Sequence, residues 1–471
     1  MALDGGGHYI SNSRPGRSYS RNGHLAKGRA EERKHPFCER TLRVPDSCAS
    51  PNLVVCRLRR VRIVYLSGSG QLGGAERCLL DVMQSLRAAE PTWTLTLLSA
   101  RGGPLVDGAR KMGFATQVVA IPEGVARLGD STATGHVTRL VGLGIRAAGS
   151  LKSLEGYRRT LRRVLAELQP DVVHTNGYKM HIMGTWSRPS NSALVWHLHD
   201  YVSTRPLMAQ AIKVLSNRCD AGIAVSASVA ADAARMWRGR TPVRVVFNAV
   251  DLQVFTPVGR QANLDALAGL TAPPPGTVRV GLVATLGRFK GHDVFLRAVA
   301  RLPRSLPVRA YVVSGSLYET KGSEFSLEAL RALAAELGIG DRVAFTGFVA
   351  DAASAMRALD VVVHATAVKE PFGLVIAEGM ACGRAVIASA AGGAAEIVRP
   401  EVDALTHEPG DVAGLALAIE RLVLDESLRT RLGAAGRKSA EERFDRNRLG
   451  AEVAPIYEMA VAQRAARRTG I

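Results

Sequence analysis

The stretch Glu370-Pro-Phe-Gly-Leu-Val-Ile-Ala-Glu378 combines two carboxylates with a turn that opens into an apolar run. The run from Leu374 to Ala381 predicts a helix, preceded by a proline and a glycine that break the chain. The first turn of a helix presents free backbone N–H groups and the positive end of the helix dipole, so it favours phosphate. Carboxylates on either side are suited to accept hydrogen bonds from hydroxyl groups. Hydroxyls on both sides of a diphosphate describe a nucleotide-sugar.

A glutamate that follows a turn is more commonly a solvated surface residue, and the neighbours of Glu378 argue against that reading. The helix continues with Gly379, Ala381, Cys382 and Gly383, which are small and mostly apolar. Such a helix is expected to pack closely, and a carboxylate buried there needs a partner because an unpaired one is costly.

The composition predicts an α/β protein of two or three domains. The chain has 471 residues, of which 47% are hydrophobic and only 5% aromatic. It has no uncharged apolar run long enough to span a membrane, and its first residues do not resemble a secretory signal. The cysteines show no zinc-finger spacing, which predicts reduced thiols and a cytoplasmic protein. They are Cys38, Cys48, Cys56, Cys78, Cys219 and Cys382.

The formal net charge of +19 is concentrated before residue 256, and the remainder of the chain is nearly neutral. A strongly basic surface favours anionic partners, which include a membrane face, a nucleic acid or an acidic substrate. The helix predicted over residues 151–168 carries several of these charges, so peripheral contact with an anionic membrane is one expectation. The charge pattern does not distinguish among these partners.

Changes in composition along the chain predict five segments. Residues 1–60 are rich in Gly, Ser, Arg and His and are expected to be a disordered basic arm, or a stretch that precedes the true start of translation. Residues 61–255 and 277–445 each alternate apolar strands with helices, and the Pro-rich residues 256–276 link them. Residues 446–471 are expected to form a helix that packs back on the first domain.

Strands and helices alternate in both halves. Strands are expected at 61–66, 94–99, 117–121, 171–174, 194–198, 222–225, 243–247, 278–284, 308–313, 343–345, 360–364 and 385–388. Helices are expected at 75–89, 105–112, 151–168, 293–300, 326–337, 352–359, 374–381 and 446–464, with residues 122–150 irregular. A strand, a Gly-rich turn and a helix open the first half, which is typical of doubly wound sheets, and two such domains joined by a Pro-rich hinge suggest a cleft between them.

Several short motifs, taken in their order along the chain, resemble the retaining GT-B glycosyltransferases of family GT4. The resemblance runs from about Ile63 to Gln463. Its motifs are Leu72-Gly-Gly-Ala-Glu-Arg77, Pro170-Asp-Val-Val-His-Thr-Asn-Gly177, Trp196-His-Leu-His-Asp200, Asn248-Ala-Val-Asp251, Lys290-Gly-His-Asp293, Phe345-Thr-Gly-Phe348 and the stretch 370–378. The resemblance implies two Rossmann-like, doubly wound domains facing a central cleft, with a C-terminal helix returning to the first domain.

The resemblance also implies which residues bind the donor. Glu370 would bind hydroxyls of the donor sugar, and Glu378 would accept hydrogen bonds from the ribose. Lys290 would neutralise the β-phosphate, and His199 would lie near the reacting sugar, so His199, Glu370 and Lys290 are the expected catalytic residues. The remaining expected donor contacts are Gly73 and Gly74, Gly347 and Phe348, and the backbone amides of Phe372, Gly373 and Leu374.

One position departs from the family pattern. Family members commonly carry an arginine five residues before the lysine, and this chain has Thr285 there. We expect Arg288, two residues before Lys290, to supply the missing positive charge; the alternative is a solvated loop arginine. The chain has no Asp-x-Asp metal motif at this site, so cations and a helix N-terminus are expected to stabilise the leaving diphosphate without a metal ion or other cofactor.

The histidines near the end of one predicted strand allow two other interpretations. His197, His199 and Asp200 could form a structural His–Asp pair or part of a zinc site, but the sequence shows no further ligand close by. The carboxyl ends of strands face the crevice in open α/β sheets, which favours a role for His199 at the site.

These observations predict a retaining hexosyltransferase that uses a UDP- or GDP-sugar and a lipid-linked, polysaccharide or small-molecule acceptor. A nucleotide-sugar epimerase or a phosphorylase on the same architecture is a second hypothesis. A non-enzymatic nucleic-acid-binding protein is a third, and it is disfavoured because the basic arm has few aromatic residues and no reader motif. The sequence leaves open the base, the sugar and the linkage formed.

Overall fold

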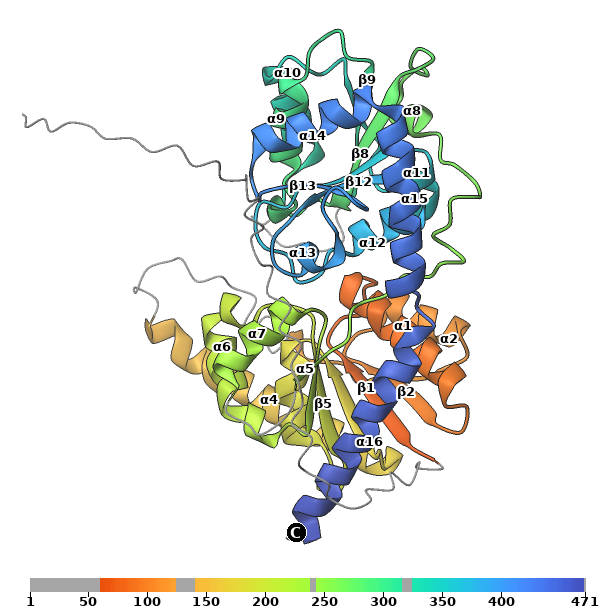
Figure 1. Ribbon diagram of the computed structural model, residues 1–471. Helices are drawn as coiled ribbons and strands as arrows, with labels where there is room; N and C mark the ends of the chain where they lie inside the picture. Colours follow the sequence, from red (N-terminus) through yellow and green to blue (C-terminus); the bar gives the residue numbers. More distant parts are fainter. Residues whose placement is uncertain (1–59, 124–139, 238–242, 316–323, 470–471) are drawn as a thin grey trace, which may run out of the picture. The chain divides into compact units, whose positions relative to one another are not determined.

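The fold contains two parallel β-sheets, each covered by helices (Figure 1). The computed structural model describes residues 60–123, 140–237, 243–315 and 324–469. Both sheets belong to one compact unit, residues 57–471. The predicted basic arm, residues 1–60, lies almost wholly outside the described residues.

The first sheet has the strand order β3-β2-β1-β4-β5-β6-β7. Its strands are β1 (Arg62–Ser67), β2 (Thr94–Ser99), β3 (Ala115–Val118), β4 (Val172–Asn176), β5 (Ala193–Leu198), β6 (Ala221–Ala224) and β7 (Val243–Val245). Its helices are α1 (Gly74–Ala89), α2 (Pro104–Lys111), α4 (Leu140–Leu168), α5 (Tyr178–Ser187), α6 (Pro206–Leu215) and α7 (Ala227–Met236). All residues of β4 and β5 are buried, as expected for parallel strands with both faces covered.

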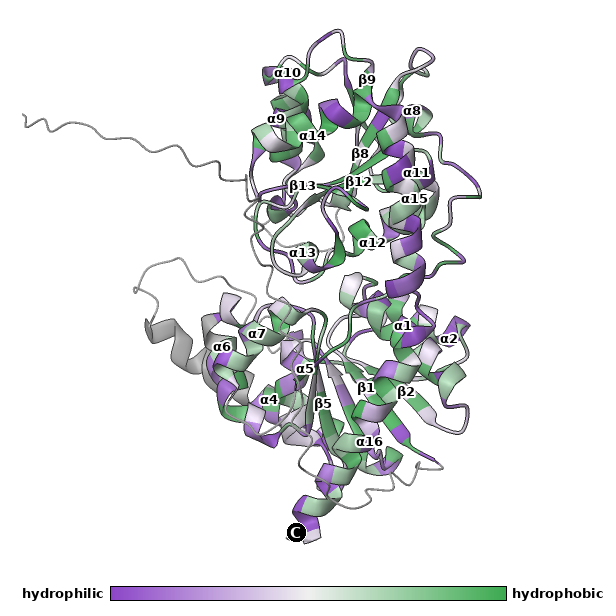
Figure 2. Ribbon diagram, in the orientation of Figure 1, coloured by the Kyte–Doolittle hydropathy of each residue, from purple (hydrophilic) through white to green (hydrophobic). Residues whose placement is uncertain are grey.

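The second sheet has the order β10-β9-β8-β11-β12-β13. Its strands are β8 (Val278–Thr285), β9 (Val308–Gly315), β10 (Val343–Phe345), β11 (Val361–His364), β12 (Ala385–Ser389) and β13 (Leu405–His407). Its helices are α8 (Leu264–Leu267), α9 (His292–Arg301), α10 (Leu327–Glu336), α11 (Ala352–Arg357), α12 (Leu374–Ala381), α13 (Gly393–Ile397), α14 (Val412–Leu424) and α15 (Glu426–Arg443). In Figure 2, α12 is hydrophobic over most of its length, which suits a helix packed between sheet and neighbours.

Both sheets reverse their strand order at the first strand of the domain. β1 pairs with both β2 and β4, and β8 pairs with both β9 and β11. In open α/β sheets, ligands bind outside the carboxyl ends of the strands at such a switch point. The segments that follow β8 and β11 carry Lys290 and Glu370, so the topology brings these two motifs together.

The last helix, α16 (Arg448–Thr469), returns to the first sheet. Gly450 lies so close to α1 that an added Cβ would stand 2.4 Å from the carbonyl oxygen of Ser85. The hydroxyl of Tyr457 lies 2.8 Å from Nδ1 of His174 in β4 and 3.4 Å from the hydroxyl of Tyr65 in β1. This return of the C-terminal helix confirms the prediction.

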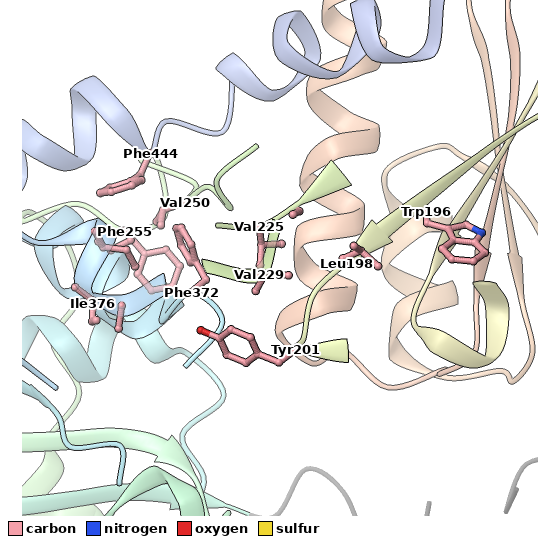
Figure 3. Close-up of a cluster of buried hydrophobic side chains, with 14 of the residues drawn as sticks. Trp196, Leu198, Tyr201, Val225, Val229, Val250, Phe255, Phe372, Ile376 and Phe444 are labelled. Carbon is pink, nitrogen blue, oxygen red and sulfur yellow. The ribbon is translucent and has the colours of Figure 1, made fainter. Parts of the chain in front are cut away.

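A buried apolar cluster joins the two domains. Figure 3 shows Phe372, Ile376 and Phe444 of the second domain in the same cluster as Val225 and Val229 of the first. The Phe372 ring lies 6.0 Å from the rings of both Phe247 and Phe444, centroid to centroid. The side chain of Phe372 is therefore core, which leaves its backbone amide for other contacts.

The structure corrects one predicted segment and adds several elements. The prediction that residues 122–150 are irregular is wrong for residues 140–150, which form the start of α4; residues 124–139 lie outside the described residues. Gly142, Gly144 and Gly149 lower the helix propensity there and explain the error. The sequence analysis did not predict the helices α5 to α8 and α13 to α15, or strand β13.

The predicted linker, residues 256–276, contains α8 and contacts the second sheet. Asp265 of α8 accepts hydrogen bonds from Arg279 of β8 and from Arg309 and Tyr311 of β9 at 2.7 to 2.9 Å. Part of this Pro-rich segment is therefore fixed by charged contacts on the second domain.

Candidate active site

Residues of both domains line a cavity of about 620 Å³. It receives Gly73 from the turn after β1, Gly74 and Arg77 from α1, and His199 from the segment after β5. The second domain contributes the ends of β8, β9 and β11 and the start of α12. Ten of the predicted residues line the cavity: Gly73, Gly74, His199, Lys290, Phe348, Glu370, Phe372, Gly373, Leu374 and Glu378.

The backbone conformation of Gly373 positions the N-terminus of α12 at the cavity wall. Gly373, which precedes the helix, has φ 100° and ψ 61°, a backbone conformation that favours glycine. An added Cβ would stand 2.9 Å from Cδ1 of Ile376. The backbone amides at the start of α12 are among the groups that no intrahelical bond satisfies. A Cβ on Gly74 would meet Leu374 at 3.3 Å, so the first-domain turn closely approaches this helix start.

Glu370 is held between two cationic or hydrogen-bonding side chains. Its Oε1 lies 2.5 Å from Nζ of Lys290, and its Oε2 lies 2.6 Å from Nε2 of His364. Burial alone would favour the neutral acid, but Lys290 and His364 outweigh burial and hold the pKa of the Glu370 carboxyl well below its usual value. Glu370 is therefore a carboxylate at neutral pH, with a fixed orientation.

Glu378 has a different environment. Its side chain is 13% exposed, and its closest cation is the guanidinium of Arg77, with Nη1 3.8 Å from Oε1. Burial raises the pKa of the Glu378 carboxyl, and Arg77 and Lys290 only partly offset that effect. At 3.8 Å the contact is too long for a good hydrogen bond, so Glu378 keeps acceptor capacity.

His199 lines the cavity as a neutral imidazole. Burial lowers its pKa to about 3. Asp200, the sequence neighbour considered as its partner, instead accepts the backbone N–H of Tyr201 at 2.8 Å. The residue that does approach the histidines is Cys78 of α1: its Sγ and one nitrogen each of His197 and His199 lie within 4.8 Å of one another.

Two predicted donor-binding residues do not reach the cavity. Arg288 and Gly347 are not among the cavity-lining residues that the structure describes. The guanidinium of Arg288 lies 4.6 Å from the ring centroid of Phe325, a cation–π arrangement. Thr285, where the family pattern has an arginine, does line the cavity. The side-chain cation that accompanies Lys290 there is Arg77.

The sequence analysis missed three residues that shape the site. His364 ends β11, and its place at the carboxyl end of a strand was a usable signal. Arg77 ends the motif Leu72-Gly-Gly-Ala-Glu-Arg77, but only the fold shows that α1 directs its side chain toward α12. Tyr201 donates a hydrogen bond from its hydroxyl to the backbone oxygen of Glu370 at 3.1 Å, a contact between domains that no local pattern indicates.

A second contact joins the domains beside the cavity. Glu396 of α13 accepts the backbone N–H groups of Ala227 and Ser228, each at 2.7 Å. These groups belong to the N-terminal turn of α7, where a carboxylate is favoured by the free N–H groups and the dipole. The carboxylate of Glu396 thus links α13 of the second domain to α7 of the first.

Two family models match the chain. One, described as Glycosyltransferase Family 4, matches residues 72–254, and another, described as Glycosyl transferases group 1, matches residues 272–439. Each match covers most of one sheet and its helices, with β1 lying before the first match, and the matched regions together include every cavity residue named above.

Two named glycosyltransferases are similar in sequence to this chain. A D-inositol 3-phosphate glycosyltransferase of Xylanimonas cellulosilytica is 32% identical over 297 residues, which are 61% of this chain and 68% of the relative. The lipopolysaccharide core biosynthesis glycosyltransferase LpsD of Rhizobium meliloti is 28% identical over 320 residues, 64% of this chain and 80% of the relative.

Two solved structures show the same fold. Anabaena HepE in complex with UDP and glucose has a TM-score of 0.66 at 24% identity, covering 84% of this chain and 99% of that one. A sucrose-phosphate synthase from Thermosynechococcus elongatus has a TM-score of 0.66 at 22% identity, covering 86% and 100%. At such low sequence identities, the similarity to these two structures shows a shared fold and nothing beyond it.

Proposed function

Because this chain belongs to the glycosyl transferases group 1 family and is a glycosyltransferase, we propose that it transfers a hexose from a nucleotide-sugar with retention of configuration. The donor is a UDP- or GDP-sugar, and the acceptor is lipid-linked, a polysaccharide or a small molecule. The observation that carries the proposal is the placement of Glu370, Glu378 and Lys290 around the N-terminus of α12 in one cavity. The structure of HepE with UDP and glucose, a protein of the same fold, supports this choice of donor.

The two glutamates bind different parts of the donor. Glu370 is a fixed carboxylate and accepts hydrogen bonds from hexose hydroxyls, whereas Glu378 accepts from the ribose. The diphosphate lies between them, against the amides of Phe372, Gly373 and Leu374. An ammonium group has three donors, so Lys290 can keep its bond to Glu370 while it donates to a phosphate oxygen.

Arg77 provides the second positive charge that the family pattern places at position 285. It lines the cavity, its side chain is 42% exposed, and its contact with Glu378 is long. A guanidinium has five donors in a planar fork, which suits phosphate oxygens. Arg288 is the weaker candidate because its guanidinium lies over Phe325. With Lys290 and the α12 amides, Arg77 stabilises the charge that develops on the leaving diphosphate, with no metal ion required.

The state of Glu370 argues for a front-side displacement. Of the cavity-lining residues that the structure describes, Glu370 and Glu378 are the carboxylates. A nucleophile would need a free carboxylate, and Lys290 and His364 engage both oxygens of Glu370. In the proposed reaction, the donor's own phosphate accepts the proton of the acceptor hydroxyl, and His199 offers a neutral ring nitrogen to a hydroxyl of the reacting sugar.

The acceptor approaches over the basic first domain. The helix α4 was expected to present Lys152, Arg158, Arg159, Arg162 and Arg163 to an anionic surface. Glu155 pairs with Arg158 at 2.6 Å and with Arg159 at 2.8 Å, which reduces the charge available there. Lys152, Arg162 and Arg163 are exposed. These three remain for contact with an acidic acceptor or an anionic membrane. No helix among the described residues is both long and apolar enough to cross a membrane.

A thermal-shift panel of UDP-, GDP- and ADP-sugars on the wild type and on Glu378→Ala tests donor binding. We expect one base to raise the melting temperature of the wild type and to act much less on the variant. Product made with that donor is then analysed by NMR for its anomeric configuration. An absence of any shift, or an inverted product, contradicts the proposal. An epimerised sugar formed from donor alone would favour an epimerase instead.

A further inference from the structure

Cys78, His197 and His199 form a cluster of potential metal-ligand atoms, and His199 also lines the cavity. Cys78 lies in α1, His197 in β5 and His199 directly after β5. The rings of His197 and His199 have their centroids 4.0 Å apart, and one ligand atom of each of the three residues lies within 4.8 Å of the others. The sequence places Cys78 far from the histidines, so only the fold brings the three together.

Three of the imidazole nitrogens of this cluster lack hydrogen-bond partners among the described residues. Nδ1 and Nε2 of His197 and Nε2 of His199 are buried and have no hydrogen-bond partner among the described residues. Buried polar atoms are nearly always paired, and each exception requires an explanation. The thiol of Cys78 donates one hydrogen bond, to Oδ1 of Asn248 at 2.8 Å. A bound ligand would explain why these imidazole nitrogens, which lie beside a thiol, have no hydrogen-bond partner.

The donor set selects the type of ligand. Each neutral imidazole has a ring nitrogen with a lone pair that can bind a metal ion. One thiolate and two imidazoles suit zinc, and they do not suit the magnesium or calcium that carboxylates bind. Zinc lies about 2.0 to 2.3 Å from such ligands, so ligand atoms in a tetrahedral site are about 3.5 Å apart. Since the three ligand atoms lie within 4.8 Å of one another, the cluster reaches that geometry by a contraction of at most about 1.3 Å.

We propose that Cys78, His197 and His199 bind a zinc ion. Coordination breaks the S–H bond of Cys78 and forms a Zn–S bond, and the proton passes to solvent. A thiol that coordinates a metal ion is deprotonated outright. The hydrogen bond to Asn248 is lost, and Asn248 and His199 both line the cavity. The fourth coordination position therefore faces the donor cavity and is open to water or to a donor group.

Zinc bound to Cys78, His197 and His199 would interfere with the transfer reaction, and this inference rests on the proposed function. His199 is assigned to the reacting sugar, and a zinc ion would occupy the nitrogen that it offers. Zinc then acts as a reversible inhibitor of a transferase that requires no metal for turnover. The binding of the ion itself does not depend on what the enzyme transfers.

Metal binding is tested on the full-length chain, reduced and stripped with a chelator, by titration with Co²⁺ and then with Zn²⁺. We expect a thiolate-to-cobalt charge-transfer band at one equivalent, which zinc abolishes. Cys78→Ser keeps a hydroxyl donor for Asn248 and should lose the band, and His197→Gln should weaken zinc binding more than about 100-fold. Cys219→Ser is the matched control, because Cys219 is also buried in the first domain and is absent from the cluster.

The outcomes separate the metal site from the catalytic assignment. No charge-transfer band in the wild type, or an unchanged band in Cys78→Ser, overturns the site even if a variant is unstable. If transfer activity is detected, micromolar zinc should inhibit the wild type, a chelator should restore it, and Cys78→Ser should resist. Zinc binding without any transferase activity would leave the site standing and contradict the proposed function.

Discussion

Nζ of Lys290 lies 2.5 Å from Oε1 of Glu370, although the two residues follow different strands, β8 and β11. These strands are neighbours at the point where the second sheet reverses its order. The pair therefore occupies the position that the topology assigns to a ligand, and both side chains are largely buried. The cation and the carboxylate fix each other, so a change in either should affect the other.

Lys290→Ala is expected to lower kcat about 10²- to 10³-fold, because a preorganised charge opposite the leaving diphosphate is lost. Glu370 would keep only His364 as a side-chain partner. Steady-state kinetics with the donor identified by thermal shift provide the measurement. Lys438→Ala is the control, since Lys438 is exposed on α15. Turnover that survives in Lys290→Ala at the control level contradicts the assignment.

Glu378→Gln should stabilise the free protein and weaken donor binding. The folded pKa of Glu378 is raised by burial, so its charge penalises the fold above the unfolded pKa, roughly 4.3. The penalty shrinks as pH falls, because the acid becomes protonated. We therefore expect a higher Tm for the variant at pH 7.5, a smaller difference at pH 5, and a reduced nucleotide-induced shift. Glu441→Gln, an exposed change on α15, should show neither trend.

The pH–rate profile should show no ionisation of His199 in the neutral range. Burial lowers its pKa to about 3, well below the usual value near 6.5. His199→Gln is expected to reduce kcat about 100-fold with the profile between pH 6 and 8 unchanged in shape. The check compares kcat across that range for both proteins. A limb near pH 6.5 that is present in the wild type and absent from the variant would show that the imidazole titrates during turnover.

Gly373→Ala should destabilise the fold and displace the amides at the start of α12. The substitution forces a residue with a Cβ to φ 100° and brings that Cβ within 2.9 Å of Ile376, at a cost of about 1 to 3 kcal/mol. Urea denaturation measures the loss. Gly269→Ala is the matched control, with φ 70° and no atom within 4 Å of the added Cβ. Equal losses in the two variants would mean that the contact with Ile376 contributes nothing.

The sequence predicted the parts of the site that lie within single motifs. The helix start at Leu374 and the strands that precede Lys290 and Glu370 follow from short-range patterns of apolar residues, Gly and Pro. Parallel strands with both faces buried give strong signals of this kind. The helix α5 was missed because its apolar residues do not gather on one face.

Contacts between distant segments could not be predicted from one sequence. The position of Arg288 near Lys290 suggested a phosphate contact, but Phe325 offers its guanidinium a ring face instead. Arg77 and Cys78 are adjacent in α1, yet one approaches Glu378 and the other the histidines after β5. The directions of these two side chains depend on how α1 packs between the two domains. The helix propensity of the residues in α1 does not encode that packing.

The return of α16 to the first sheet bears on how this chain folds during synthesis. Tyr65 and His174 belong to early strands, but their partner Tyr457 is made only after the whole second sheet. At translation rates of about 5 to 20 residues per second, the first sheet waits roughly 10 to 40 s after β7 for that helix. During this interval the apolar face of the sheet that α16 covers is exposed. A nascent chain should therefore depend on chaperones until α16 has left the ribosome.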